Sequence, residues 1–222
     1  GDLGNADRVF AAVYAEYQYR MAAANAVDFD DLIMRTVELF AASPEAHGQG
    51  VLAVLNGEIH SARDIQKVHT TAVQAFASPD VGTLGRMEQG APRFRRRVLT
   101  RHTARSEFRF ESAAALPYVP ILYGHAGADS RLAAAAVEGG AAGIVYAGTG
   151  DGSIHEAVRK PLLSAAEKGV IVVRASRTGA GAVLSDESGC QEAYFIEADT
   201  LPPAKARILL ALALSETKER AK

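Results

Sequence analysis

The sequence has little cysteine, no tryptophan and no long apolar run. Because Cys190 is the only cysteine, an intrachain disulfide and a zinc site built from several cysteines are excluded. A membrane-spanning helix needs about 18 apolar residues in a row, and the longest candidate, "ARILLALALSE", is shorter. No basic stretch followed by an apolar one opens the chain, so no secretory signal is predicted. The compartment is left open between cytoplasm and periplasm.

The sequence also has no large excess of positive or negative charge. The formal net charge is −2, which gives no general attraction to nucleic acid or to anionic lipid. We therefore expect neither a nucleic acid nor a membrane as a partner. Hydrophobic residues make up 48% of the 222 residues and charged residues 23%, which is typical of a globular protein with one large or two small domains.

Residues 8–41 are predicted to form two helices. Apolar residues recur at a spacing of four in the first, which gives that helix an apolar face. Asp28 is the predicted N-cap of the second. Pro44 disfavours a helical conformation at the residue before it, so the second helix should end near Ala42.

Residues 48–110 follow a different pattern. "GVLAVL" (50–55) predicts a buried strand, and the ionisable and hydroxyl side chains of residues 56–76 follow it with no apolar period. Residues 83–99 predict two short strands around a turn at Gln89-Gly90-Ala91-Pro92. Polar clusters at strand ends are where α/β proteins usually place their sites, so residues 56–76 are the first place to look for function.

Residues 117–222 alternate between strand and helix patterns, which predicts a parallel sheet covered by helices on both faces. Pro161 lies inside one expected helix, and Pro202-Pro203 opens the last one. The fold class is therefore α/β. The expected strands are 119–126, 141–148, 170–176 and 193–198, and the expected helices are 129–140, 153–169 and 204–220.

Six blocks of sequence, in order, resemble the bacterial L-asparaginases and cover roughly residues 42–218. They are "GVLAVLNGEIHSARDIQKVHTT" (50–71), "RHTARSEF" (101–108), "LPYVPILYGHAGAD" (116–129), "GAAGIVYAGTGDGSI" (140–154), "GVIVVRASRTGAG" (169–181) and "LPPAKARILLALAL" (201–214). The resemblance implies hydrolysis of L-asparagine or L-glutamine, with no cofactor, in a dimer or tetramer whose sites are shared between subunits.

The same resemblance implies a division of the chain into three parts. A flavodoxin-like asparaginase C-terminal domain is expected over residues 113–222. A truncated α/β remnant of the asparaginase N-terminal domain is expected over 43–112, and a helical extension over 1–42.

Lys67 is the residue that the resemblance marks most directly. The family's "RDxxKxxTT" segment carries a lysine that works with a Thr-Asp pair to activate the attacking group, and Lys67 matches it in "RDIQKVHTT". Such a lysine passes protons between a hydroxyl and a carboxylate. A second threonine of the family forms a covalent acyl-enzyme, which divides amide hydrolysis into two easier steps.

The partners of that lysine are missing from the sequence. The family's nucleophilic threonine lies in a "TGGTI" turn and its Thr-Asp pair in "HGTDT", and neither string occurs in these 222 residues. The resemblance therefore predicts an asparaginase scaffold with turnover at or near background. Two alternatives remain open, a non-catalytic oligomerisation module and a nucleic-acid-associated fragment.

A second resemblance concerns residues 13–40, which are similar to a helical segment of superfamily 1 repair helicases. In those proteins "DFDDLI" follows a "YxxYQxRL" helix, and this chain has "YAEYQYRM" followed by "DFDDLI". The helicase phosphate-binding loop G-x-x-x-x-G-K-[ST] is absent from the sequence, so the segment implies no ATPase chemistry. The two resemblances together indicate a chimaera.

Glu187 is the second residue with a role implied by the asparaginase resemblance. Family members use an acidic residue from the neighbouring subunit to hold the substrate's α-amino group, and counting back from Tyr194 places Glu187 there. The surrounding "SDESGCQEA" needs a gap to align, and a solvated loop carboxylate is the alternative. Gly127 stands where some asparaginases have an asparagine that reaches the neighbouring site. Asp129 is predicted to cap the helix that follows it.

Three further groups of residues have a structural interpretation. The glycines of "AGTGDGS" lack the G-x-G-x-x-G spacing, so a tight turn with Ser153 as helix cap is predicted. The histidines near Asp64 lack the spacing of a ligand set, and no metal is predicted. The arginines of "RFRRRVLTR" are interpreted as a solvated edge strand and not as a nucleic-acid contact. The residues concerned are His60, His69 and His102, and Arg95, Arg96, Arg97 and Arg101.

Overall fold

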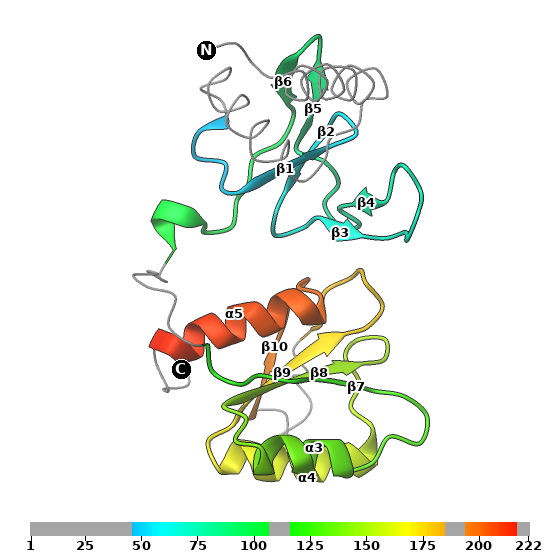
Figure 1. The fold of residues 1–222 in the computed structure, drawn as a ribbon, viewed down its shortest axis with the longest axis vertical. Coiled ribbons are helices and arrows are strands. Elements are labelled where there is room, and N and C mark those ends of the chain that lie inside the picture. Colours follow the sequence, from blue (N-terminus) through cyan, green and yellow to red (C-terminus); the bar gives the residue numbers. More distant parts are fainter. Residues whose placement is uncertain (1–45, 107–115, 185–193, 217–222) are drawn as a thin grey trace, which may run out of the picture. The chain divides into compact units, whose positions relative to one another are not determined.

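The computed structural model describes residues 46–106, 116–184 and 194–216. The chain divides into two compact units, an N-terminal unit of residues 1–104 and a C-terminal unit of residues 105–222 (Figure 1). The two helices expected over residues 8–41 lie outside the described residues, as does Glu187. The division into three parts stays a prediction.

The N-terminal unit contains a four-stranded antiparallel sheet in the order β1-β2-β5-β6. The strand expected at 50–55 is confirmed as β1 (Leu52–Leu55), which pairs with β2 (Glu58–Ser61). Asn56 and Gly57 join them, both with positive φ of 54° and 73°. This is the backbone of a tight hairpin turn, which Asn-Gly favours. Residues 58–61, which show no apolar period, thus form a strand.

The second hairpin of this sheet is confirmed, with a shorter turn than expected. β5 (Gly85–Glu88) pairs with β6 (Ala91–Phe94), and only Gln89 and Gly90 lie between them. Ala91 and Pro92 belong to β6, an edge strand, where the missing N–H of proline is tolerated. The arginines from Arg95 onward follow the end of β6, so the prediction that they form an edge strand is wrong.

The core of this unit is small. It is formed by Ala46, Leu52, Ile59 and Leu84, with Val54, Met87, Phe94 and Val98 packed against them. The remaining elements that the structure describes before residue 106 are the short pair β3 and β4 and a 3₁₀ turn at Thr103–Arg105.

The C-terminal unit has a four-stranded parallel sheet in the order β10-β9-β8-β7, and the α/β fold class is confirmed. Two helices, α3 and α4, pack on one face of the sheet and α5 packs on the other (Figure 1). All six residues of β8 are buried because both faces of this strand are covered. The elements are β7 (Ile121–Tyr123), α3 (Arg131–Glu138), β8 (Gly143–Gly148), α4 (Glu156–Glu167), β9 (Ile171–Ser176), β10 (Phe195–Glu197) and α5 (Pro203–Glu216).

Two helix starts differ from the predicted ones. The N-cap of α4 is His155, whose Nδ1 accepts a hydrogen bond from the backbone N–H of Ala157 at 3.3 Å, so the prediction of Ser153 is wrong. The N-cap position of α3 belongs to Ser130, which makes no side-chain capping bond. Asp129 supplies the carboxylate instead, because its Oδ1 accepts from the backbone N–H of Arg131 at 3.0 Å.

Candidate functional site

Lys67 lies on a short hairpin next to the four-stranded sheet. β3 (Gln66–Lys67) pairs antiparallel with β4 (Phe76–Ala77), and Lys67 is directly opposite Phe76. The loop between the strands closes through the backbone N–H of Val68, which donates to the carbonyl of Ala75 at 2.8 Å. We call residues 66–77 the Lys67 hairpin.

The Lys67 side chain is exposed and lies over an aromatic ring. Its Nζ is 5.9 Å from the centre of the Phe76 ring, at the outer limit of a cation–π contact. Val73 in the loop is 85% exposed, so this end of the hairpin has little packing of its own. The Phe76 ring is thus a contact that the structure gives the Lys67 ammonium.

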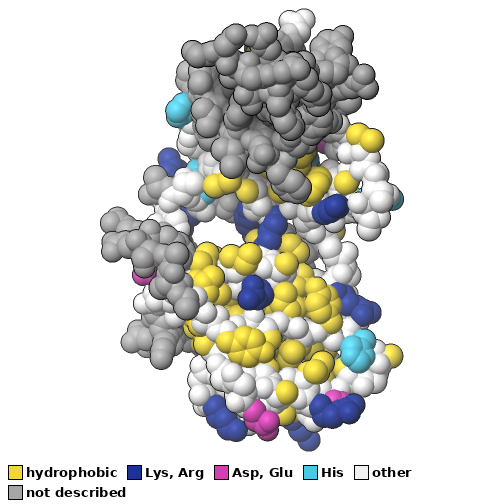
Figure 2. All heavy atoms as spheres, in the orientation of Figure 1, with side chains coloured by type: hydrophobic (Ala, Val, Ile, Leu, Met, Phe, Trp, Pro, Cys, Tyr) yellow, Lys and Arg dark blue, Asp and Glu magenta, His cyan; other side chains and the backbone are white. Residues whose placement is uncertain are grey.

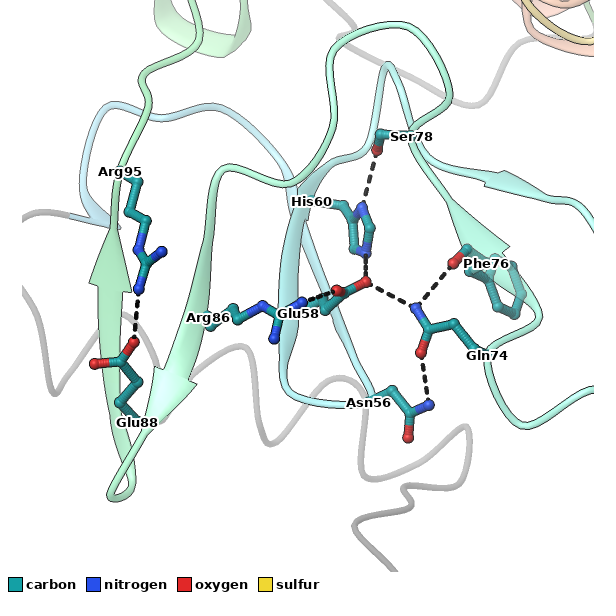
Figure 3. Close-up of polar contacts among 9 residues, drawn as sticks. All are labelled: Asn56, Glu58, His60, Gln74, Phe76, Ser78, Arg86, Glu88 and Arg95. Atoms are coloured by element: carbon teal, nitrogen blue, oxygen red, sulfur yellow. Dashed lines mark hydrogen bonds and ion pairs between the residues drawn. The ribbon is translucent and has the colours of Figure 1, made fainter.

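A glutamine fastens the hairpin on one side of β4. The Gln74 side-chain nitrogen donates to Glu58 Oε2 at 2.7 Å and to the carbonyl of Phe76 at 3.2 Å. Its oxygen accepts from Asn56 Nδ2 at 2.7 Å (Figure 3). Glu58 is also held by Arg86, whose guanidinium lies 2.8 Å from its other oxygen. Gln74 thus joins the hairpin to the β1–β2 turn and to β2.

A histidine and a serine fasten the hairpin on the other side of β4. His60 Nδ1 lies 2.9 Å from Ser78 Oγ, and His60 Nε2 lies 3.6 Å from Glu58 Oε2 (Figure 3). The carboxylate favours the tautomer with hydrogen on Nε2, so that Nδ1 accepts from the Ser78 hydroxyl. Burial lowers the pKa of His60 below its ordinary value, and the Glu58 charge opposes that effect.

A serine, a histidine and a carboxylate in contact resemble the residues of a hydrolytic triad, but their burial excludes that chemistry here. His60 is 1% exposed and Ser78 is 6% exposed. A nucleophile must reach the carbon that it attacks, and this hydroxyl is enclosed. The Lys67 ammonium lies outside this cluster and is exposed. The sequence analysis did not find this cluster, because Glu58, His60, Gln74 and Ser78 form no local motif.

The other candidate residues are not brought together with Lys67. Among the residues that the structure describes, no three His, Cys, Asp or Glu side chains lie close enough to hold a metal ion. His69 uses its Nδ1 to accept the backbone N–H groups of Thr71 and Ala72 at 3.1 and 2.9 Å. Of the arginines after β6, Arg95 pairs with Glu88 and Arg96 donates to the carbonyl of Val81.

In the C-terminal unit, Arg174 organises the loops at the ends of the parallel strands. This buried side chain donates to the carbonyls of Asp151 and Leu184 at 3.1 and 2.5 Å. Asp151 also accepts the backbone N–H of Leu184 at 2.8 Å. The tight turn predicted for "AGTGDGS" is confirmed, since Ser153 N–H donates to the carbonyl of Thr149 at 2.9 Å.

A cavity of ≈ 320 Å³ lies beside the loop that follows β7. Gly127, with φ of 76°, lines it together with Tyr123, His125 and Tyr146. Asp129 at its edge pairs with Arg131 at 2.7 Å, and the Arg131 hydrogen bonds lower the pKa of this carboxyl.

No helix within the described ranges is long and apolar enough to cross a membrane.

Comparison with known protein families finds a match in each of the two units. The family model "Asparaginase, N-terminal" matches residues 34–100, which include the Lys67 hairpin. The model "Glutaminase/Asparaginase C-terminal domain" matches residues 118–222. These two parts of the chain are therefore similar to the N-terminal and C-terminal domains of asparaginases. The family resemblance predicted from the sequence is confirmed, and the model "UvrD/REP helicase N-terminal domain" also matches, over residues 3–52.

Individual asparaginases are also similar to this chain in sequence and structure. The chain is 40% identical to L-asparaginase 2 of Bacillus subtilis (strain 168), over 81% of this chain and 47% of the relative. It is 37% identical to a glutaminase-asparaginase of Pseudomonas fluorescens biotype A, over 81% of this chain and 50% of the relative. The crystal structure of a probable cytoplasmic L-asparaginase from Campylobacter jejuni matches with a TM-score of 0.77 and 40% identity, covering 85% of this chain and 61% of that one. The chain thus spans about half the length of the curated relatives that it matches.

Proposed function

We propose that this chain supplies the relay lysine and the C-terminal domain of an asparaginase-type amidohydrolase. The reaction is hydrolysis of the side-chain amide of L-asparagine or L-glutamine to the acid and ammonia. The observation that carries the proposal is the exposed Lys67 ammonium, displayed on a hairpin inside the region that matches the asparaginase N-terminal family. Relatives named as asparaginases and glutaminase-asparaginases support this substrate class.

We propose further that these 222 residues alone turn over substrate at or near background. Amide hydrolysis through an acyl-enzyme needs a nucleophile and a group that takes its proton. Lys67 is present, but the "TGGTI" and "HGTDT" strings that carry the family's threonines and aspartate are absent from the sequence. Glu187 as the substrate's amino-group ligand remains a proposal. The helicase-like segment is proposed to be the joined part of a chimaera without ATPase chemistry.

Ammonia release from L-asparagine and from L-glutamine by the purified chain tests the proposal. The expected result is a rate equal to that of the Lys67→Ala variant. Lys160→Ala, an exposed lysine on α4, is the matched control. Turnover that is lost in Lys67→Ala and kept in Lys160→Ala would show that another residue serves as nucleophile, and the proposed inactivity would be wrong.

A non-catalytic oligomerisation module is the second candidate, and α5 is the observation that favours it. This helix, "PAKARILLALALSE", is apolar on nearly all sides, which is typical of a helix that is covered all round. Leu210 and Ala211 face the sheet, yet Ile208 is 50% and Leu209 is 40% exposed. Figure 2 shows hydrophobic side chains gathered on the visible face of the C-terminal unit. We propose that a second copy of this chain covers them.

A further inference from the structure

Two side-chain contacts, which we call tethers, join β2 to the residues on either side of β4, the strand that carries Phe76. Gln74 precedes it and Ser78 follows it, and each side chain contacts β2 (Figure 3). Their partners, Glu58 and His60, are two residues apart on β2 and therefore on the same face of that strand. One face of β2 thus fixes both ends of β4.

The Lys67 hairpin cannot hold its own shape. Its strands have two residues each, and an isolated two-stranded hairpin is at best marginally stable in water. Its loop is exposed at Val68 and Val73, so burial of apolar surface contributes little there. Contacts from outside the hairpin must therefore supply its order, and the Gln74 and Ser78 tethers are contacts of that kind.

We infer that His60 and Gln74 are positioning residues for Lys67: they hold β4 against β2, which places the Phe76 ring under the Lys67 ammonium. Neither residue touches substrate in this account. Their role in a reaction rests on the proposed function of Lys67, but their effect on the place of the ammonium group does not. Glu58 links the two tethers, because the same oxygen, Oε2, faces both His60 and Gln74.

The position of Lys67 can be measured without any enzymatic activity. The chain has six lysines, so labelling lysine with ¹³C at Cε gives a spectrum in which Lys67 is assigned by its loss in Lys67→Arg. Because Lys67 Nζ lies 5.9 Å from the centre of the Phe76 ring, we expect the ring current to displace the Lys67 Cε signal from the position of an exposed lysine. Phe76→Leu removes the ring and defines the undisplaced position.

A matched pair of His60 variants separates a change in the position of Lys67 from a general loss of structure. In His60→Asn the amide lies where Nδ1 lies and keeps the bond to Ser78. In His60→Gln the amide lies where Nε2 lies and loses that bond. Gln74→Ala removes the second tether, and Ser215→Ala, which removes an exposed hydroxyl on α5, is the control.

The expected result is a Lys67 signal that moves to the Phe76→Leu position in His60→Gln and Gln74→Ala and stays in place in His60→Asn and Ser215→Ala. Backbone amides of residues 66–77 should exchange roughly tenfold faster in the first two, the effect of losing about one hydrogen bond. If the Lys67 signal stays at its wild-type position in both His60→Gln and Gln74→Ala, and amide exchange is unchanged, the inference is overturned. The ammonia assay reports separately on the proposed function, so failure of one does not imply failure of the other.

Discussion

His60 links the stability of the fold to pH. Burial lowers its pKa below the ordinary value of 6.5, while the Glu58 carboxylate, itself paired with Arg86, opposes the shift. As the pH falls below 6.5, the unfolded chain therefore binds a proton before the folded one does. The stabilising contribution is complete above that pH and is lost as the pH falls towards the lower pKa of the folded state.

We therefore predict that acid destabilises the wild-type chain more than His60→Asn, which cannot titrate. The measurement is the free energy of unfolding in urea at about pH 7.5 and about pH 5. Glu58 and Arg86 are present in both proteins, so the difference between the two pH effects isolates the imidazole. An equal loss in both proteins would show that His60 is not the group responsible.

The sequence predicted a role for Lys67 but did not predict the contacts around its hairpin. A motif of nine residues, "RDIQKVHTT", was enough to mark the lysine. The contact of His60 with Ser78 joins residues 18 positions apart, and that of Gln74 with Glu58 joins residues 16 apart. No local periodicity encodes such contacts, because they arise from the packing of one hairpin beside another.

At the scale of elements, the parallel sheet was predictable and the antiparallel one only partly. Strands such as β8 and β9 are continuous apolar runs separated by helices, and that alternation leaves few other arrangements. β2 reads "EIHS", with charged and polar side chains that gave no apolar pattern. The Asn56-Gly57 pair before it was the available signal, since both residues need positive φ in a tight hairpin.

The exposed face of α5 leads to a prediction at the same scale. If a second copy covers Ile208, a charge there must be desolvated on association, so Ile208→Glu should shift the chain towards monomer in sedimentation velocity. Ser215→Glu adds the same charge near the exposed end of the same helix and should leave association unchanged. Monomeric wild-type chain at all concentrations would remove the case for an oligomerisation module.

At the scale of the whole molecule, the chain combines two parts that match asparaginase families with a segment that matches a helicase family. The parts that match asparaginases contain Lys67, the proposed relay lysine, on its hairpin and the four strands of the parallel sheet. The chemistry that the family performs also needs the threonines and aspartate of two strings that this sequence lacks. We therefore propose that the chain is a scaffold that holds Lys67, one member of the family's catalytic set.

The most direct test adds the missing members and measures ammonia release from L-asparagine. The purified chain is mixed with a separately produced asparaginase N-terminal segment that carries "TGGTI" and "HGTDT". We expect background release by either piece alone, and release by the mixture that is absent when Lys67→Ala replaces the wild-type chain. Release by the mixture that is unchanged in Lys67→Ala would contradict the assignment of Lys67 as the relay lysine.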